Sequence, residues 1–229
     1  MSFLAILFAL LLEQARPLGQ INQVHNANRG WVRWVVRNCD AGKPWQGGLT
    51  WSLSVLVPAL LAFGMHWLLV WTLGWVAAVF WNIAVLYITL GFRQFSHHFT
   101  LIRDALYAGD EALARQALAK WMRMDASELP RSEIVRHVIE YSAVCAHRHV
   151  FGVLAWYSLG AAIGLGPAGA VFYRTVEYVG RLVNRPVQPN HAPLSAAFQD
   201  SANRAWYLAD WVPVRLTALG FAFVGSFEE

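Results

Sequence analysis

Apolar residues in this chain are gathered into long blocks instead of the short periodic stretches of a water-soluble domain. The longest block runs from Pro44 to Phe92, forty-nine residues without an Asp, Glu, Lys or Arg. A helix needs about 20 residues to cross the hydrocarbon of a bilayer, so this block is long enough for two crossings. We predict a transmembrane hairpin over residues 49–92, with its turn near Trp71–Gly74.

The region before this block, residues 1–48, combines a short apolar start with a basic amphipathic segment. Residues 1–12 are apolar but too few for an upright crossing, which predicts a tilted or partly embedded helix. In residues 13–43, arginines alternate with Trp and Val side chains from Trp31 to Val36. This pattern suits a helix on the surface of a bilayer, and a surface helix of a soluble protein is the alternative.

Residues 93–148 carry the charge that the apolar block lacks, with eight basic and seven acidic residues. Gly109 and Pro130 divide this segment, and acidic residues follow each break, where they favour the start of a helix. The apolar positions recur at helical spacing and are Phe99, Ile102, Leu106, Leu113, Leu118 and Trp121. We therefore predict three water-facing helices.

The distribution of basic residues predicts how the chain is oriented. Thirteen of them lie in residues 13–43 and 93–148, and none lies in the predicted turn between the two spans. Cytoplasmic loops carry the excess of Lys and Arg in membrane proteins. We expect an all-α, polytopic helical membrane protein whose residues 93–148 form a cytoplasmic helical segment, open to a cytoplasmic protein partner.

Residues 149–229 have the least regular apolar pattern. Val150–Tyr173 is free of charge and long enough to cross once, but the glycines of Gly164–Gly169 in its middle make a broken or re-entrant element the alternative. Three prolines within residues 184–200 predict a loop. The last apolar stretch, Trp211–Phe227, is either a final crossing or a helix along the interface.

Composition narrows the classes of partner. Hydrophobic residues make up 57% of the chain, and twelve tryptophans fit the aromatic belts of a membrane protein, so the lipid bilayer is the main expected partner. The net charge of +4 is spread along the chain, which gives no patch for nucleic acid. Cys39 and Cys145 lie far apart without CxxC spacing, so we predict neither a disulfide framework nor a zinc site.

Few residues have the spacing of a catalytic or metal site. Gly164–Gly169 lacks the Lys-Ser/Thr ending of a phosphate loop. His137 and Glu140 share a helix face and could recruit His147, but no established ligand spacing is present, so we expect no metal site. Arg148 lies at the edge of an apolar run, as does Arg215. Snorkelling to lipid headgroups explains such arginines, and binding an anionic group of a ligand is the alternative.

Two local patterns resemble the CobD/CbiB family and its AmpE relatives, which are bacterial inner-membrane proteins. Between Ala155 and Arg174 the chain reads AWYSLG and then GPAGAVFYR, which is similar to the family's APLFWYALGG and PGALLYR. Asp210–Ala218 reads DWVPVRLTA, which is similar to NWIPARLTA in the synthases and DWVPVRL in AmpE proteins. Family members commonly continue past this point to another membrane segment, so the resemblance implies a shortened member or a fragment.

The resemblance implies either a synthase or a regulator. Synthases of the family attach an aminopropanol arm, or its phosphate, to the corrinoid adenosylcobyric acid, with ATP and Mg²⁺. The synthases share the motif ExxxENxxDG, and its first acid is present here as Glu140. The synthases also have an Asp pair before the second motif. The other positions differ: the EN pair falls on Val144–Cys145, the DG pair on Arg148–His149, the Asp pair on Trp206–Tyr207, and Asn26 follows His25 where the family has proline.

These replacements favour a non-catalytic interpretation. An arginine in place of an aspartate would repel Mg²⁺, and AmpE proteins, which are linked to signalling in β-lactamase induction, also lack those acids. We interpret the chain as an AmpE-like regulator or scaffold, and adenosylcobinamide-phosphate synthase is the alternative. The candidate ligand-binding residues are Glu140, His147, Arg148, Asp210 and Arg215, of which Glu140, Arg148 and Arg215 are also the catalytic candidates. Glu177 is a further acid beside the matched motifs.

Overall fold

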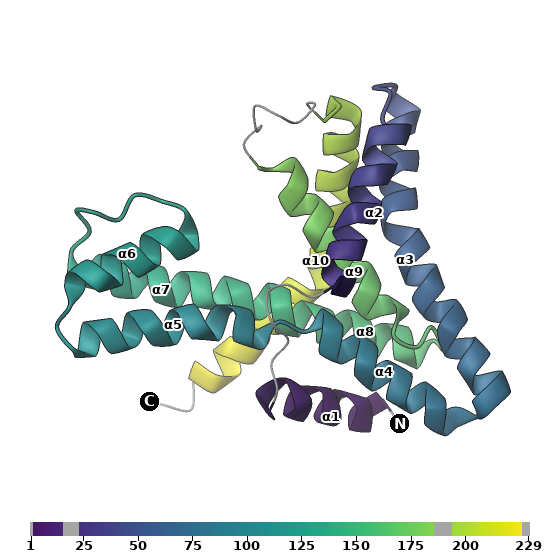
Figure 1. The fold of residues 1–229 in the computed structure, drawn as a ribbon, viewed down its shortest axis with the longest axis horizontal. Helices are drawn as coiled ribbons and strands as arrows, with labels where there is room; N and C mark the ends of the chain where they lie inside the picture. The colour runs from purple at the N-terminus through teal and green to yellow at the C-terminus, as the bar shows by residue number, and fades with distance from the viewer. Residues whose placement is uncertain (1, 16–22, 186–193, 226–229) are drawn as a thin grey trace. The chain divides into compact units, whose positions relative to one another are not determined.

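The structure is a computed structural model that describes residues 2–15, 23–185 and 194–225. These residues form helices and no strand, which confirms the all-α expectation. They divide into two compact units, residues 1–90 with 151–229 and residues 91–150. Each unit is described by itself, with the helix labels of Figure 1.

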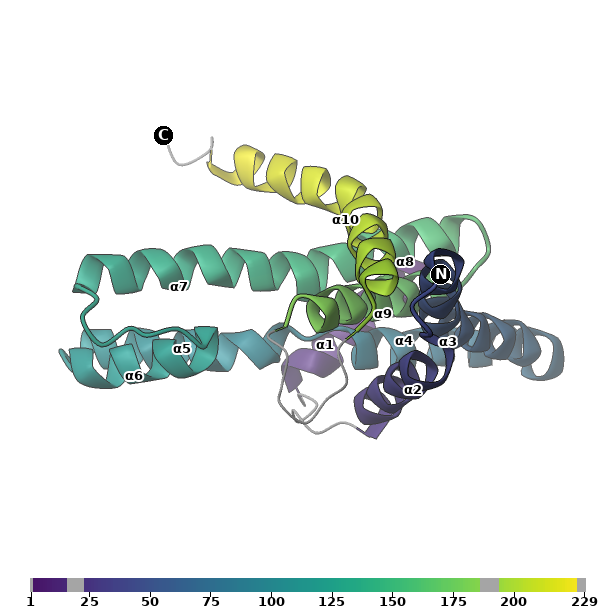
Figure 2. The ribbon, with the colours of Figure 1, turned by 90° about the horizontal axis from the view of Figure 1, so that it is seen from above.

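In the described ranges, seven helices build the first unit. They are α1 (Ser2–Ala15), α2 (Gln23–Cys39), α3 (Pro44–Leu73), α4 (Trp75–Thr89), α8 (Gly152–Ala162), α9 (Ala168–Val183) and α10 (Ala196–Gly225). Helix α9 packs against α3, α4, α8 and α10, and lies among them in Figures 1 and 2. Twelve of its 16 residues are buried, so α9 is largely enclosed by the unit.

The predicted turn between two apolar helices is present. Helix α3 ends at Leu73, Gly74 has φ +82°, and α4 begins at Trp75. This φ lies in the region that favours glycine, and it lets the chain reverse within one residue. The indole of Trp81 donates to the carbonyl of Ala62 across the hairpin at 3.2 Å.

The lengths of the two helices differ from the expectation of two spans. Helix α3 has 30 residues, and within the described ranges it alone is long and apolar enough to cross a membrane. Helix α4 has only 15 residues and ends at Thr89, three residues before the predicted end of the hairpin. At 1.5 Å per residue such a helix covers about 22 Å, less than the roughly 30 Å of hydrocarbon.

The N-terminal region forms two separate helices. Helix α1 is short and apolar, as expected, and packs on α4 with Ala5 and Ala9 buried. Helix α2 is the amphipathic segment, and its Val32 and Val35 are buried. It packs on α3, so the apolar face of α2 is covered by protein.

The expectation of one crossing over Val150–Tyr173 is wrong, and the broken element is the correct alternative. Helix α8 ends at Ala162, and α9 starts at Ala168 and packs back along α8. A Cβ on Gly169 would lie 2.0 Å from the carbonyl oxygen of Trp156. The two backbones therefore approach at a distance that only glycine allows.

Helix α10 begins earlier than expected. The predicted loop 184–200 lies partly outside the described residues, but residues 196–200 are helical. Pro213 lies inside this helix of 30 residues, which bends along its length in Figure 2. A proline inside a helix removes one backbone hydrogen bond and bends the helix.

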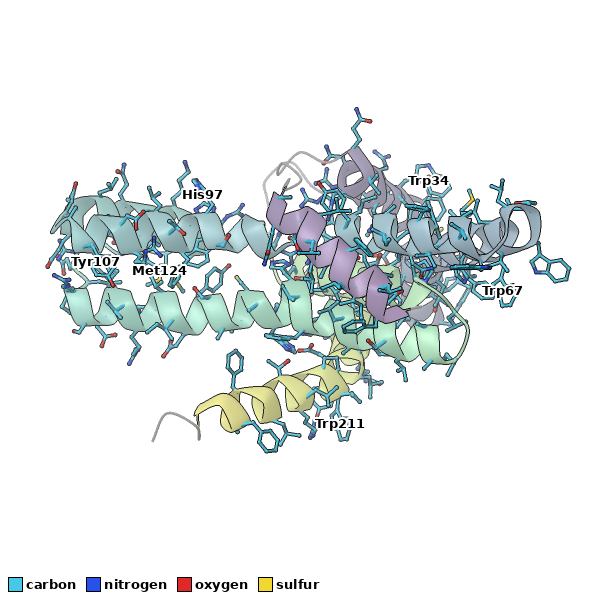
Figure 3. The ribbon with its side chains drawn as sticks, turned by 90° about the horizontal axis from the view of Figure 1, so that it is seen from below. Trp34, Trp67, His97, Tyr107, Met124 and Trp211 are labelled. Carbon is cyan, nitrogen blue, oxygen red and sulfur yellow. The ribbon has the colours of Figure 1, made fainter. Side chains whose placement is uncertain are left out.

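The second unit confirms the three predicted helices. They are α5 (Phe92–Tyr107), α6 (Glu111–Met122) and α7 (Arg131–Ala146), followed by a π-helical turn, His147–Phe151. His97 and Tyr107 lie on α5 (Figure 3). Asp110 caps α6 by accepting from the Leu113 amide at 2.9 Å, and Gly109 has φ +76°.

The apolar positions of the second unit form its core, with one exception. Ile102, Leu118 and Ile134 are buried together, and Trp121 packs against them. Leu113 is 41% exposed, contrary to expectation. The core face of α6 is carried by Ala114, Ala117 and Leu118, and Leu113 lies about 100° away from Ala114 around the helix.

Candidate functional site

A group of charged side chains is buried on α9. Arg174 is 7% exposed and Glu177 only 1%. Burial of a charge is costly unless another charge or hydrogen bond compensates it. The partners of these two residues therefore define the site.

Glu177 lies between two arginines of the same helix. Arg174 donates from Nη1 to Glu177 Oε2 at 3.3 Å, and Arg181 donates from Nη2 to the same oxygen at 2.8 Å. Residues three and four positions apart lie on the same helix face, which brings the three side chains together. Burial lowers the pKa of Arg174, and the Glu177 carboxylate opposes that shift.

Helix α2 supplies the other side of the site. Asn28 donates from Nδ2 to the Thr175 hydroxyl at 3.2 Å, and the Arg29 guanidinium lies 5.8 Å from the centre of the Tyr178 ring. Burial lowers the pKa of His25 to about 4, and the positive charges of Arg174, Arg29 and Arg181 add to this shift. His25 is therefore neutral at pH 7. We call His25, Arg29, Arg174, Glu177 and Arg181 the cationic cluster.

The cationic cluster has an excess of positive charge. Within this set of five residues, three arginines stand beside one glutamate, and the neutral His25 adds no charge. Guanidinium groups bind phosphate and carboxylate oxygens with paired, charge-assisted hydrogen bonds. An anionic group such as a phosphate is therefore the ligand that this arrangement complements.

Next to the cluster, α9 is joined to α10. The Tyr173 hydroxyl donates to Asp210 Oδ1 at 2.8 Å. A Cβ on Gly152 would lie 2.2 Å from the Tyr173 hydroxyl, so the tyrosine occupies the space that this glycine leaves. Asp210, one of the candidates from the sequence, is therefore hydrogen-bonded to a residue of α9, the helix that carries the cluster.

The two sequence motifs also meet at the bend of α10. Pro213 has no amide hydrogen, so the carbonyl of Ala209, four residues earlier, loses its helical donor. The indole of Trp156 donates to this carbonyl at 2.8 Å. Trp156 of the first motif thus supplies the hydrogen-bond donor that the Ala209 carbonyl lacks because of Pro213 in the second motif.

The remaining candidates lie elsewhere. The Arg215 guanidinium lies 3.7 Å from the centre of the Trp211 ring and donates to the Trp211 carbonyl, so it is engaged locally on α10. Trp211 is labelled in Figure 3. Glu140 is exposed on α7 and pairs with Arg136. His147 is buried and Arg148 half-buried in the π-helical turn. These last three residues belong to the second unit.

Comparison with known proteins decides the family. The model of the family described as "CobD/Cbib protein" matches residues 3–228, nearly the whole chain. The chain belongs to the CobD/CbiB family.

Similar CobD/CbiB relatives have a common name. A protein of Stutzerimonas stutzeri is 29% identical over 97% of this chain and 70% of its own length. One from Chromobacterium violaceum is 30% identical over 62% of this chain and 43% of its own length. One from Pelobacter propionicus is 28% identical over 81% of this chain and 54% of its own length. Each is called "Cobalamin biosynthesis protein CobD". No solved structure matches the chain.

These comparisons correct the functional interpretation drawn from the sequence. The AmpE-like regulatory role is not supported, because the family is CobD/CbiB and the relatives are named for cobalamin biosynthesis. The synthase alternative fits those names better. The loss of the acidic motifs therefore weighed too much against an enzyme.

Magnesium, which the CobD/CbiB synthases use, is not matched by this cluster. The Glu177 carboxylate accepts from two arginines, and Asp210 accepts from Tyr173. In the ranges that the structure describes, no three His, Cys, Asp or Glu side chains gather as metal ligands. Mg²⁺ prefers oxygen ligands without nearby positive charge. The cluster fits an anion, and we derive no step through a metal ion.

Sequence reasoning missed most of the cluster. It considered Glu177 and, through the altered motif, His25, but not Arg174 or Arg181. The available signal was the spacing of Arg174, Glu177 and Arg181, at three and four residues on a helix that is otherwise apolar on that side. The contribution of Arg29 depends on tertiary contact between α2 and α9, which no local pattern reveals.

Proposed function

We propose that this chain is a membrane-embedded synthase of cobalamin biosynthesis, which joins an aminopropanol arm, or its phosphate, to a carboxylate of a corrinoid. Family membership and the names of the relatives support this proposal. The observation that carries it is the group of three arginines around the buried Glu177 on α9 and α2, because a phosphate-bearing substrate needs such a site.

Amide formation from a carboxylate requires that the carboxylate be activated first. A corrinoid carboxylate oxygen attacks the γ-phosphorus of ATP, so an acyl phosphate forms and ADP leaves. The amine nitrogen of the aminopropanol arm then bonds to the acyl carbon and loses a proton, and the carbon–oxygen bond breaks to release phosphate. Both steps place phosphate charge where arginines stabilise it.

The residues of the cluster have separate roles in this proposal. Arg29, Arg174 and Arg181 bind the phosphate oxygens. Glu177 fixes the two arginines of α9, which its carboxylate joins at 3.3 and 2.8 Å. A role in ligand binding stays a prediction for Glu140, His147, Arg148 and Arg215. The contact of residues 93–148 with a protein partner also stays a prediction.

Membrane insertion is part of the same proposal. Helix α3 exposes large apolar side chains along its length, among them Leu60, Leu61, Leu68 and Trp71, which water would solvate poorly. The shorter apolar helices α1 and α4 extend this apolar surface. We place the chain in the inner membrane of a bacterium, crossing it more than once, with residues 93–148 in the cytoplasm.

Complementation tests the enzyme activity. We expect the full-length gene to restore cobalamin-dependent growth to a bacterium that lacks its own CobD/CbiB synthase. Failure to grow, with the protein present in the membrane fraction, would overturn the proposal.

A pair of variants then tests the role of the cluster. Arg29→Gln removes the positive charge that lies beside Tyr178 of α9, whereas Arg33→Gln removes a charge one turn later on α2, and both arginines are exposed. We expect Arg29→Gln to raise the KM of a phosphate-bearing substrate roughly tenfold, as for the loss of one charged hydrogen bond. Arg33→Gln should leave that KM unchanged.

The assay also identifies which phosphate binds the cluster. It is run in membranes, with aminopropanol or its phosphate as acceptor. If the cluster binds ATP, Arg29→Gln raises the KM for ATP with both acceptors. If it binds the acceptor, only the KM of the phosphorylated acceptor rises. Unchanged KM values for all substrates would remove the cluster from the proposed site.

A further inference from the structure

We propose that the first unit also contains a binding pocket for a small uncharged molecule, in which His66 is the hydrogen-bond donor. The pocket lies between α1, α3, α4 and α8 and shares no residue with the cationic cluster. It therefore stands independently of the proposed enzyme activity.

The pocket is a cavity of about 220 Å³ with mainly apolar walls. Trp75 and Val79 of α4 and Ala161 of α8 form part of its lining. Its polar lining comes from His66, Asn82 and Tyr157. Such a combination of apolar walls and a few convergent polar groups is typical of small-molecule sites.

Asn82 orients the polar groups of the pocket. Its Nδ2 donates to the Ala78 carbonyl at 2.6 Å and contacts His66 Nδ1 at 3.1 Å. Its Oδ1 accepts from the Tyr157 hydroxyl at 3.3 Å. Both hydrogens of the Asn82 amide are thus used, so His66 Nδ1 is an acceptor and the neutral ring carries its hydrogen on Nε2.

The Nε2–H of His66 is the group left for a ligand. Within the described residues no acceptor is paired with it, since the contacts of this ring are the one to Asn82 and an edge contact with Trp67. Gly166, with φ +57°, packs against the other side of the ring, and a Cβ there would lie 2.7 Å from His66 Cγ. The ring is therefore held in place by groups that leave its donor available.

The lining also defines the class of ligand. Among the described residues that line the pocket there is no Asp, Glu, Lys or Arg, so a charged ligand would lose its hydration without gaining a counter-ion from them. An apolar cavity of about 150 Å³ holds benzene, so this one has room for a slightly larger molecule. We infer an uncharged, largely apolar ligand with one hydrogen-bond acceptor, such as a short or cyclic alcohol.

Photolabelling tests the pocket in the full chain, reconstituted in lipid nanodiscs. The probe is a short alcohol that carries a diazirine, and mass spectrometry locates the labelled peptides. We expect saturable labelling of α4 and α8 that an excess of cyclohexanol competes away. Labelling at these helices separates the pocket from general partition into lipid.

Three variants sharpen the test. Ala161→Leu fills the cavity without removing a hydrogen bond, and we expect it to abolish the saturable labelling. Ala162→Leu adds the same volume at the exposed neighbouring position and should label as wild type. His66→Phe keeps a ring but removes the donor, and labelling should require about tenfold more probe.

Two further probes give the results that would overturn the inference. Equal labelling by the carboxylate analogue of the probe would show that the site does not select uncharged molecules. Equal labelling by the alkane analogue, unaffected by His66→Phe, would indicate a lipid chain in the cavity instead of a hydrogen-bonded ligand. Because the complementation assay does not involve these probes, failure here would leave the proposed function standing, and the reverse holds too.

Discussion

The two units of the molecule both have a buried apolar core, but they differ in buried charge and in exposed apolar surface. In the first unit Glu177 and Arg174 are buried, while Leu61 on α3 is 69% exposed. In the second unit Ile102 and its neighbours form a buried apolar core, and Arg136 pairs with Glu140 at the surface. The first arrangement suits lipid around the helices, and the second suits water.

This difference shows that helical spacing alone does not determine how much an ion pair contributes to the stability of the fold. Glu177 with Arg181 and Glu140 with Arg136 are both four residues apart. The surface pair is screened by water and contributes little. In the buried group, the charges cannot be rehydrated, so removal of one partner leaves the other uncompensated.

The largest expected effect comes from breaking the buried pair. Glu177→Gln should lower the free energy of unfolding by about 3–5 kcal/mol, because the buried Arg174 and its neighbour Arg181 then lose the negative charge of Glu177. Chemical unfolding of the detergent-solubilised protein measures this change. The matched variant Glu140→Gln should cost less than about 1 kcal/mol. Equal effects of the two variants would contradict the comparison of the two units.

A smaller effect is expected where the first unit satisfies a backbone carbonyl with an indole. Trp156→Phe should lower the free energy of unfolding by about 1–3 kcal/mol, because the Ala209 carbonyl, opposite Pro213, then has no donor. Trp81→Phe is the control. It also removes an indole bond to a helical carbonyl, that of Ala62, but this carbonyl keeps its donor four residues later.

The same unfolding measurement decides between these two tryptophans. If Trp81→Phe destabilises the protein as much as Trp156→Phe, the contribution of Trp156 is packing of the ring and not the bond at the proline.

The smallest effect concerns pH. The pKa of His25 is about 4 in the folded protein, below its ordinary value of 6.5. As pH falls from about 6.5 toward 4, the unfolded chain binds a proton at His25 before the folded protein does, so stability decreases. His25→Gln should remove this part of the pH dependence.

Thermal unfolding of wild type and His25→Gln between pH 8 and pH 4 checks this expectation. The difference in unfolding temperature between the two proteins should be constant above pH 7, where the imidazole is neutral in both states, and should shrink or reverse at lower pH. A difference that stays constant across the whole range would show that His25 titrates normally. Added phosphate should raise the pKa of His25 if the cationic cluster binds it.

Local signals were sufficient for much of the fold. Gly74, Gly109 and Pro130 end or separate helices through their own backbone preferences, and these breaks could be predicted. Leu113 was assigned to the wrong face because the periodic pattern did not show where α6 turns toward its core. The reversal between α8 and α9 was only one of two alternatives, since a glycine-rich stretch marks a break without giving the direction of the chain after it.

The candidate site was less accessible to sequence reasoning than the fold. Asp210 was identified through a motif, but its partner Tyr173 lies on another helix. Arg174 and Arg181 cannot be recognised as site residues from the sequence alone. They form the candidate site only in the fold, where four helices pack against α9. The count of lost acids favoured the AmpE-like interpretation, which the comparisons do not support, because it considered what the family motif lacked and not which charges lie together.

The central place of α9 has a consequence for how the protein is made. Its neighbours α3, α4 and α8 leave the ribosome before it, whereas α10 follows it. Until α10 arrives, the side of α9 where Tyr173 bonds to Asp210 stays uncovered. The closing of this unit is therefore a late event in biogenesis, and a chain stalled before Ala196 would display a surface that quality-control proteases can recognise.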